Sequence, residues 1–206
     1  INLIMANELK SENVLKIKGI SIGSLTWKIT MDDKQYLTSI KLRDRGFLSK
    51  LYSFQGEYSV IGSVNDNTLI PKEYNQYWKT KKKEREVKII FDNQKIFDIF
   101  MNPKEKELAR IDYKKLINYV DPLSSFLNIL INNKSSKTID GRRVYILSPP
   151  TQNDKGVILI KNYKNIWADH KRNDLEYISI VKDSIKLFPK KIIIKFKGMV
   201  FSLIKI

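Results

Sequence analysis

Residues 14–30 read VLKIKGISIGSLTWKIT, and apolar residues alternate with polar residues along most of this stretch. A period of two is that of a β-strand with one buried face. The alternation changes phase near Gly19 and Gly23, where we expect bulges or a close approach of two backbones. The stretch therefore predicts a half-buried strand. Its apolar positions are Leu15, Ile17, Ile20, Ile22, Leu25, Trp27 and Ile29.

The same pattern recurs along the chain. A turn at 31–35 (MDDKQ) separates the first segment from YLTSIKL (36–42), so we expect these two to form a hairpin. Turn residues at 65–67 and 140–141 separate other alternating segments. Regularly spaced strands predict a mainly β fold, either a curved antiparallel sheet or a partly open β-barrel. The further strands are predicted at 58–64, 73–80 (after Pro71), 85–92, 96–101, 142–147, 156–163, 176–183 and 190–206.

One segment has a helical period instead: VDPLSSFLNILINNK, residues 120–134. Asp121 is a good N-cap, and Pro122 suits the first helical position. We therefore predict one short covering helix at about 121–133, packed over one face of the sheet. It is either a permanent plug, the commoner use of such a helix, or a lid over an apolar groove. Its apolar stripe is formed by Leu123, Phe126, Leu127, Leu130 and Ile131.

Length and composition favour one domain. The chain has 206 residues, 42% of them hydrophobic, which suffices for a substantial core. Residues 1–6 form an apolar stub that ends in the small residue Ala6, as at the end of a signal peptide, so we expect export. The single domain is then predicted at 7–206. No apolar run reaches the roughly 18 to 20 residues that a transmembrane helix needs.

No set of residues indicates a reaction. The chain has no cysteine, and its single histidine, His170, lies in a polar segment without a second histidine. Asp32, Asp33 and Asp66 lie in predicted turns, where aspartate serves the backbone. Glycine-rich phosphate motifs and nucleophile elbows are missing from the sequence. We therefore expect no enzymatic activity, no cofactor and no metal site.

The charge is strongly positive, with 38 Lys and Arg against 22 Asp and Glu, a net charge of +16. Such an excess favours anionic partners, although a lysine-rich coding composition produces the same excess. The basic run KTKKKEREVK (79–88) follows three aromatic residues and could bind a polyanion. We interpret it as the solvated tip of a hairpin whose lysines protect a sheet edge, so no nucleic acid is expected.

Four segments in order resemble a known bacterial family: GISIGSLTW (19–27), LIPKEYNQYW (69–78), VDPLSSFL (120–127) and DGRRVYIL (140–147). Together they are similar to an exported family known as domain of unknown function 3108, from about Val14 to the C-terminus. The resemblance implies location in the Gram-negative periplasm or at the outer membrane, a β-rich fold related to curved open barrels, and no enzymatic activity. The heavy lysine content departs from the family's usual composition.

Two functions follow as expectations. The first is binding of a lipid or another amphiphile of the cell envelope inside the curved sheet. The second is a structural or assembly role, in which the basic face or a sheet edge docks onto an anionic or other envelope partner. A cytoplasmic polyanion binder is a third reading. For the first function, the candidate residues are Trp27 and Phe47 as lining, Leu123, Phe126, Leu127 and Leu130 on the helix, and Arg142 or Arg143 at the rim, paired with Asp121 or Asp140 or with an anionic head group.

Overall fold

The computed structural model describes residues 7–46, 53–151, 156–167, 174–183 and 187–206. Phe47, His170 and the predicted signal remnant at 1–6 lie outside the described residues. The described residues form one sheet of fourteen strands and one α-helix, α1 (Pro122–Asn132). The prediction of a mainly β fold with one short helix is therefore confirmed.

The strands follow one another across the sheet almost in chain order. The order is β7-β6-β5-β4-β3-β2-β1-β14-β13-β12-β11-β10-β9-β8. The bounds are β1 (Asn7–Ile17), β2 (Ile20–Met31), β3 (Gln35–Asp44), β4 (Phe54–Asn65), β5 (Thr68–Thr80), β6 (Glu84–Asp92), β7 (Lys95–Asn102), β8 (Tyr119–Val120), β9 (Ser136–Ile139), β10 (Arg143–Ser148), β11 (Val157–Asn165), β12 (Leu175–Val181), β13 (Lys191–Phe196) and β14 (Met199–Lys205).

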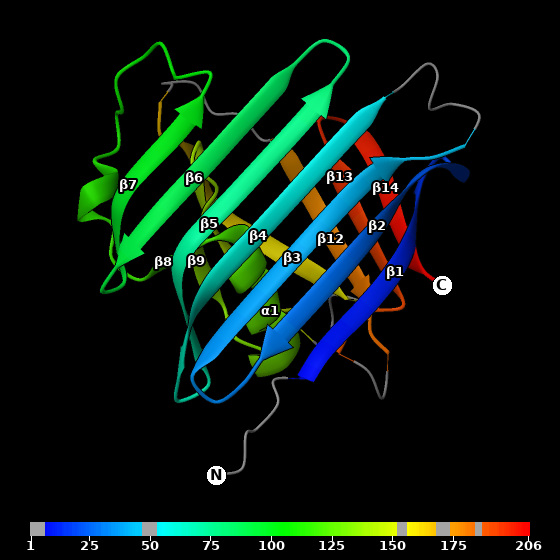
Figure 1. Cartoon of the computed structure of the whole chain (residues 1–206), viewed down its shortest axis with the longest axis horizontal. Helices are drawn as coiled ribbons and strands as arrows, with labels where there is room; N and C mark the ends of the chain where they lie inside the picture. Colours follow the sequence, from blue (N-terminus) through cyan, green and yellow to red (C-terminus); the bar gives the residue numbers. More distant parts are fainter. Residues whose placement is uncertain (1–6, 47–52, 152–155, 168–173, 184–186) are drawn as a thin grey trace.

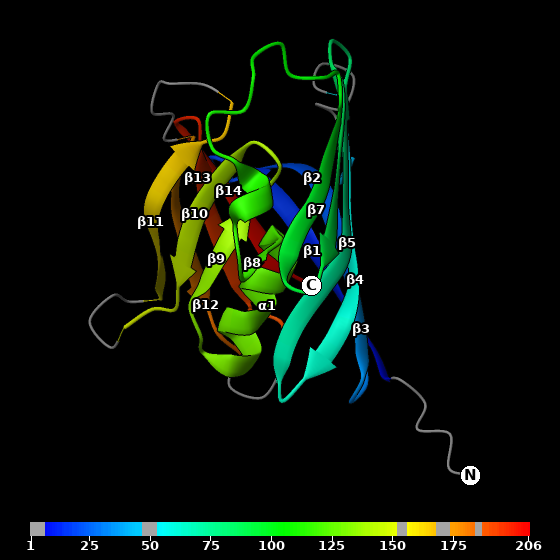
Figure 2. The ribbon, with the colours of Figure 1, turned by 90° about the vertical axis from the view of Figure 1, so that its left-hand side faces the viewer.

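The sheet curls back on itself into two facing layers. Strands β1 to β7 form the front layer in Figure 1, and β9 to β14 lie behind it, with α1 between the layers (Figures 1 and 2). The segment 103–118, with the 3-10 helix η2 (Tyr113–Lys115), connects β7 to β8. It contacts the β6–β7 turn, where Asn118 N donates to Gln94 O at 2.9 Å, and the start of β7, where Ile117 pairs with Lys95. The segment therefore joins the two edges of the sheet into a nearly closed barrel.

Two predicted single strands are hairpins. Residues 14–30 belong to β1 and β2, and residues 190–206 belong to β13 and β14. The turns are Lys18–Gly19 (φ 48° and 83°) and Lys197–Gly198 (φ 51° and 75°). Two-residue turns with positive φ match the twist of a hairpin. The expectation of a bulge at Gly19 is therefore wrong.

The second expected irregularity, at Gly23, is confirmed. The register of β1 against β2 shifts just beyond the Leu15–Gly23 pair. A Cβ atom at Gly23 would lie 2.4 Å from the carbonyl oxygen of Arg43. The backbone of β3 therefore approaches so closely that only glycine fits.

Three further details differ from the sequence prediction. Pro71 lies within β5, at a shift of the β4–β5 register, and does not precede the strand. The short strands β8 and β9 are not predicted. They also form the one parallel pair among the described strands, whereas a purely antiparallel sheet was expected.

The predicted helix is confirmed, with Asp121 as its N-cap. The Asp121 carboxylate accepts hydrogen bonds from the amides of Leu123 and Ser124 at 2.9 and 3.0 Å. The C-cap is Asn133, in the left-handed region at φ 50°. Within the described residues, no helix is long and apolar enough to span a membrane.

The predicted apolar stripe of the helix is only partly right. The helix was expected to cover one face of the sheet, but it is enclosed between two layers and contacts β4, β5, β9 and β10. Ile129 is fully buried, whereas Ile131 is 43% exposed. Because the helix is enclosed, polar residues are buried with the apolar ones: Ser124, Ser125 and Asn128.

Candidate functional site

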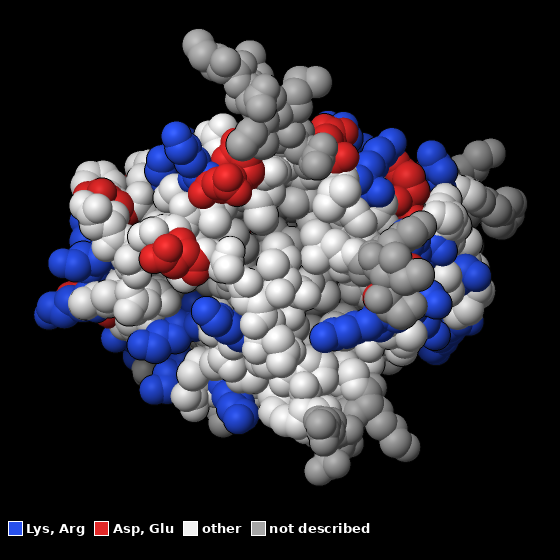
Figure 3. Space-filling model, turned by 90° about the horizontal axis from the view of Figure 1, so that it is seen from below, with Lys and Arg blue, Asp and Glu red and all other residues white. Residues whose placement is uncertain are grey.

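The lower half of the interior, at the end with the turns at 32–34 and 66–67, is filled by α1 (Figure 1). Opposite it, one inner row of the front layer is buried: Ile29, Thr38, Val60, Tyr74, Ile89 and Ile99, all at most 8% exposed. Seen from below, the centre of this end is uncharged, and charged side chains lie toward its two sides (Figure 3).

Most of the predicted apolar site residues meet in this lower half. The ring of Trp27 lies 5.8 Å from Phe126 and 5.1 Å from Phe188, and its Nε1 donates to Thr38 Oγ1 at 2.8 Å. Leu123 and Leu127 are 7% and 0% exposed, whereas Phe126 and Leu130 are partly buried against the same core. These side chains pack against one another and leave the predicted lining covered.

Polar contacts fix the position of α1. The Tyr36 hydroxyl and the Ser124 hydroxyl share a hydrogen bond of 2.6 Å. Two more pairs join the helix to β9, one between the Ser125 and Thr138 hydroxyls at 2.7 Å and one from Asn128 Nδ2 to Ser136 Oγ at 3.1 Å. Because leaving a buried polar group unpaired is costly, these pairs favour a single position and orientation of the helix between the layers. In this structure, α1 is a plug.

The plug contains an ionisable group. The Asp121 side chain is 0% exposed, and it also accepts a hydrogen bond of 2.5 Å from Ser124 Oγ. Burial raises the pKa of Asp121 to about 6, although the hydrogen bonds from Ser124 and Leu123 act in the opposite direction. The stability of the protein with the helix packed in this position should therefore depend on pH.

The upper half of the interior, at the end with the turns at 81–83 and 197–198, is built differently. Apolar residues continue the inner rows there, but α1 does not reach them, and they are partly buried or, at Ile20 and Met199, exposed. Ile20 is 58% exposed and Met199 is 49% exposed. Side chains of directly paired residues share a face. We call the following set the upper inner face: Ile17, Ile20, Leu42, Trp78, Ile194, Met199 and Phe201.

Trp78 is the largest member of the upper inner face. It stacks on Phe54 with ring centroids 5.9 Å apart and an interplanar angle of 12°. Its cross-strand neighbour is Gly56, where a Cβ atom would lie 2.9 Å from the indole ring. The glycine therefore makes room for the indole on this face.

Arginines from the β9–β10 turn lie beside the upper inner face. Arg143 binds Asp140 at 3.2 Å and Asp174 at 2.5 Å, and Arg142 binds Glu105 at 2.7 Å. The predicted ion pair between an arginine and Asp140 is thus confirmed. The alternative partner, Asp121, lies in the plug and bonds to Ser124. The structure therefore separates Arg142 and Arg143 from the predicted helix residues.

Further cations surround these arginines. Burial lowers the pKa of Lys197, and Arg143, Arg85 and Lys83 act in the same direction, against Asp174. Arg85 is the cross-strand partner of Trp78. We call Lys83, Arg85, Arg142, Arg143 and Lys197 the basic rim. These bases outnumber the carboxylates that pair with them, so the rim keeps a positive potential.

Two buried polar atoms without a partner in the described part of the chain lie here, one in the rim and one beside it. Within the described residues, Arg143 Nε and Tyr163 Oη are buried and form no hydrogen bond. Burial also raises the pKa of Tyr163 to about 12, so its hydroxyl stays protonated near neutral pH. Such groups in a native protein call for an explanation, and an unseen ligand is one.

Sequence reasoning missed Trp78, Arg85, Ile194 and Phe201 as site residues. They come from strands far apart in the sequence, and only the order of the sheet brings them to one end. One signal in the sequence could have pointed to this end. The alternation of apolar and polar residues in 190–206 continues past the turn at 197–198, and the first apolar residue after it, Met199, is 49% exposed.

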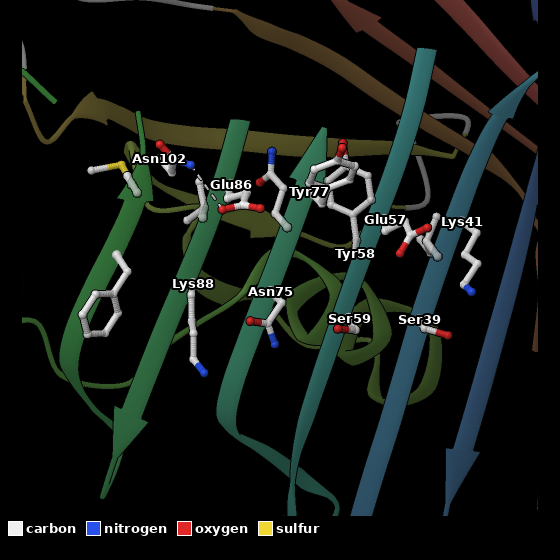
Figure 4. A pocket seen from close by; sticks show the side chains of 15 residues that line it. Ser39, Lys41, Glu57, Tyr58, Ser59, Asn75, Tyr77, Glu86, Lys88 and Asn102 are labelled. Atoms are coloured by element: carbon white, nitrogen blue, oxygen red, sulfur yellow. Dashed lines mark hydrogen bonds between the residues drawn. The ribbon is translucent and has the colours of Figure 1, made fainter. Parts of the chain in front are cut away.

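The outer face of the front layer carries a separate groove with a volume of about 560 Å³ (Figure 4). Two outer rows of side chains form its walls, and the backbone of the row between them forms its floor. One wall is Ser39, Ser59, Asn75, Lys88 and Phe100; the other is Lys41, Glu57, Tyr77, Glu86 and Asn102.

A family model described as "Protein of unknown function (DUF3108)" matches residues 13–140. The match includes three of the four segments that carry the resemblance, begins next to the expected Val14 and ends at Asp140, so it does not extend over 141–206. It covers β2 to β9, the helix and nearly all of the groove-bearing front layer. Comparisons with curated proteins and with solved structures gave no significant match.

Proposed function

The chain belongs to the DUF3108 family of proteins of unknown function, and from that premise we propose that it is a non-enzymatic binding protein of the bacterial cell envelope, exported to the periplasm or the outer membrane. Its ligand is an anionic amphiphile, such as a lipid or a fatty acid, held between the layers. One observation carries this proposal: above α1, the inner rows stay apolar and only partly buried beside a basic rim.

The apolar part of the ligand would cover the upper inner face. Exposed apolar surface costs roughly 25 cal/mol per Å² relative to burial. A cluster that includes Ile20 at 58% exposure and Met199 at 49% exposure is therefore a site that gains from an apolar occupant. The lower half offers no such gain, since α1 already covers it.

The charged head group would lie at the rim. Arg85 and Lys197 are the best candidates to contact it. Among the described residues, Arg85 forms no ion pair, and the pair between Lys197 and Asp174 is long, at 3.9 Å, whereas Arg143 binds Asp140 and Asp174 at 3.2 and 2.5 Å. Arg143 is a positioning residue, held by its two aspartates, with its Nε still available. Guanidinium groups suit carboxylate and phosphate oxygens.

The three tryptophans allow a direct test, because each lies in a different region. Trp78 belongs to the upper inner face, Trp27 lies in the plugged half, and Trp167 donates to Gly141 O near the β9–β10 turn. Variants that keep one tryptophan, the other two being changed to phenylalanine, would be titrated with 9,10-dibromostearate, a brominated fatty acid that quenches on contact. We expect quenching of Trp78 but not of Trp27.

The outcomes are distinct. Equal quenching of Trp27 and Trp78 would mean that α1 leaves its seat, so that the helix is a lid and the ligand fills the lower half. Lack of quenching at both positions, with folding verified by circular dichroism, would overturn the proposal. Native mass spectrometry of protein from the periplasm of a Gram-negative host, before and after organic extraction, would identify a bound lipid by mass.

A second candidate function is docking onto an envelope protein through a sheet edge. It is favoured by the edge strand β7, where Phe97 and Phe100 are 63% and 52% exposed. Large exposed apolar side chains on an edge strand favour protein contacts. A clean mass without lipid, together with a complex that Phe97→Asp abolishes, would make this function the primary one.

A further inference from the structure

We propose that the outer groove of the front layer binds a neutral oligosaccharide. This site is independent of the amphiphile site, because the two lie on opposite faces of the same strands. The groove runs across β3, β4, β5, β6 and β7. At a strand spacing of about 4.8 Å, five strands give it a length of about 19 Å, which suits an extended chain.

The charges of the groove are balanced within the protein. Its walls carry two lysines, Lys41 and Lys88, and two glutamates, Glu57 and Glu86. Lys88 binds Glu73 at 3.0 Å, and Glu57 pairs with Arg43. On a chain with a net charge of +16, a groove without excess charge does not select anions. Its occupant is therefore uncharged.

The walls offer hydrogen-bonding groups that the protein does not use. Ser39 and Ser59 face each other across β3 and β4, and their hydroxyls have no partner within the described part of the chain. Asn75 is next in the row, and its Nδ2 donates to Glu73 at 2.9 Å, which leaves its oxygen accessible as an acceptor. Small side chains in this row also produce the depression (Figure 4).

Two aromatic side chains complete the walls. Tyr77 is half buried on one side, with its hydroxyl donating to Glu84 at 2.9 Å, and Phe100 is 52% exposed on the other. Aromatic faces attract the C–H groups of flat, weakly polar rings. A sugar ring carries both such C–H groups and hydroxyls. It can therefore contact the aromatic side chains of the walls and form hydrogen bonds with their polar side chains.

Other occupants fit less well. A peptide strand cannot add to the sheet here, because the groove crosses mid-sheet strands whose backbone groups already pair with their neighbours. An aliphatic chain would leave the serine, asparagine and charged side chains without water or partners. An oligosaccharide can replace the lost water with its own hydroxyls.

Saturation-transfer NMR with chitohexaose, cellohexaose and maltohexaose tests the proposal. Ser59→Arg fills the middle of the groove, and Leu37→Arg is the matched control, since Leu37 is 45% exposed on the same outer face but outside the walls. Both positions are on the solvent face, so both variants should fold. We expect transfer from the protein to at least one of these sugars, reduced at least fivefold in Ser59→Arg and unchanged in Leu37→Arg.

Two results would overturn the proposal: no transfer to any of the three sugars, or transfer that both variants leave equal. A complex between protein copies that Ser59→Arg abolishes, without sugar binding, would assign the groove to a protein partner instead. Adding stearate distinguishes the two sites, because sugar binding must persist when the upper inner face is occupied.

Discussion

The two halves of the interior are built from the same strands but differ in what covers them. In the lower half, Val60 and Ile89 are at most 1% exposed beneath α1. Two rows higher, on the neighbouring strands β5 and β3, Trp78 and Leu42 are only partly buried. The residue types are equally apolar, so the difference comes from the length of the helix, which ends before it reaches the upper rows. An apolar inner face thus does not by itself make a core.

The largest effect should come from a charge in the plugged half. Leu127→Asp places a carboxylate at a position with 0% exposure, where an unpaired charge costs several kcal/mol. We expect the variant to unfold or to lose most of its stability, measured by urea denaturation. Ile131→Asp, on the same helix but at a 43% exposed position, is the matched control and should cost well under 1 kcal/mol. Similar melting of both variants would contradict the assignment of α1 as a plug.

This pair of substitutions also shows how far the sequence can predict the site. The N-cap Asp121, Pro122 and the apolar spacing suffice to place the helix to within a residue at each end. They do not reveal that it is enclosed on both sides, because the second layer depends on where the sheet curls. Ser124, Ser125 and Asn128 lie outside the predicted apolar stripe, yet all three are buried, in hydrogen bonds to Tyr36 and β9.

The hairpins show a second limit of the same kind. Alternation locates strands well, but Lys18–Gly19 and Lys197–Gly198 do not stand out as turns within alternating segments, because lysine rarely adopts positive φ. Missing these turns hides the β1–β14 pairing that joins the layers. The upper inner face and the basic rim depend on that pairing, so they could not be predicted from local pattern.

Tryptophan truncation gives the next largest effect. Trp27→Ala removes a side chain that is 2% exposed and hydrogen-bonded to Thr38, and such truncations cost about 3 to 5 kcal/mol. Trp78→Ala removes the same atoms from a partly buried position and should cost less, about 2 to 3 kcal/mol, in proportion to the smaller area it buries. Denaturation followed by circular dichroism, which does not depend on the lost fluorophore, measures both. Equal costs would mean that the upper inner face is as well packed as the lower half.

The pH dependence of the plug is the third prediction. Because the folded pKa of Asp121, about 6, is above its unfolded value of 3.8, the folded state binds more protons between these values. The contribution of this group to stability is therefore complete below about pH 4 and decreases as the pH rises through 6. The loss is on the order of 2 to 3 kcal/mol.

Asp121→Asn isolates this contribution, since asparagine is also a good N-cap and does not ionise. The free energy of unfolding of the wild type minus that of the variant should decrease between pH 4.5 and pH 7.5. A difference that stays constant over this range would show that Asp121 titrates normally. Other carboxylates titrate alike in both proteins, so they cancel in the comparison.

The smallest effect on stability is expected at the rim, where binding should change instead. Arg142 and Glu105 are 24% and 23% exposed, and an accessible ion pair contributes about 1 kcal/mol or less. Arg142→Gln should therefore leave the melting temperature almost unchanged. If the rim holds the anionic head group, the affinity for stearate should decrease roughly three- to tenfold, equivalent to about 0.6 to 1.4 kcal/mol, and should depend less on salt.

Arg43→Gln is the matched control for the rim. Arg43 also pairs with a glutamate, Glu57, but its pair is 40% exposed and lies on the outer face of the front layer. Both substitutions remove one positive charge and one ion pair, so a general effect of net charge would lower stearate affinity equally in both. A decrease confined to Arg142→Gln would place the head group between the layers. An equal decrease would mean that the rim acts only as part of the general positive charge of the chain, so that the partly buried upper inner face has no head-group site of its own beside it.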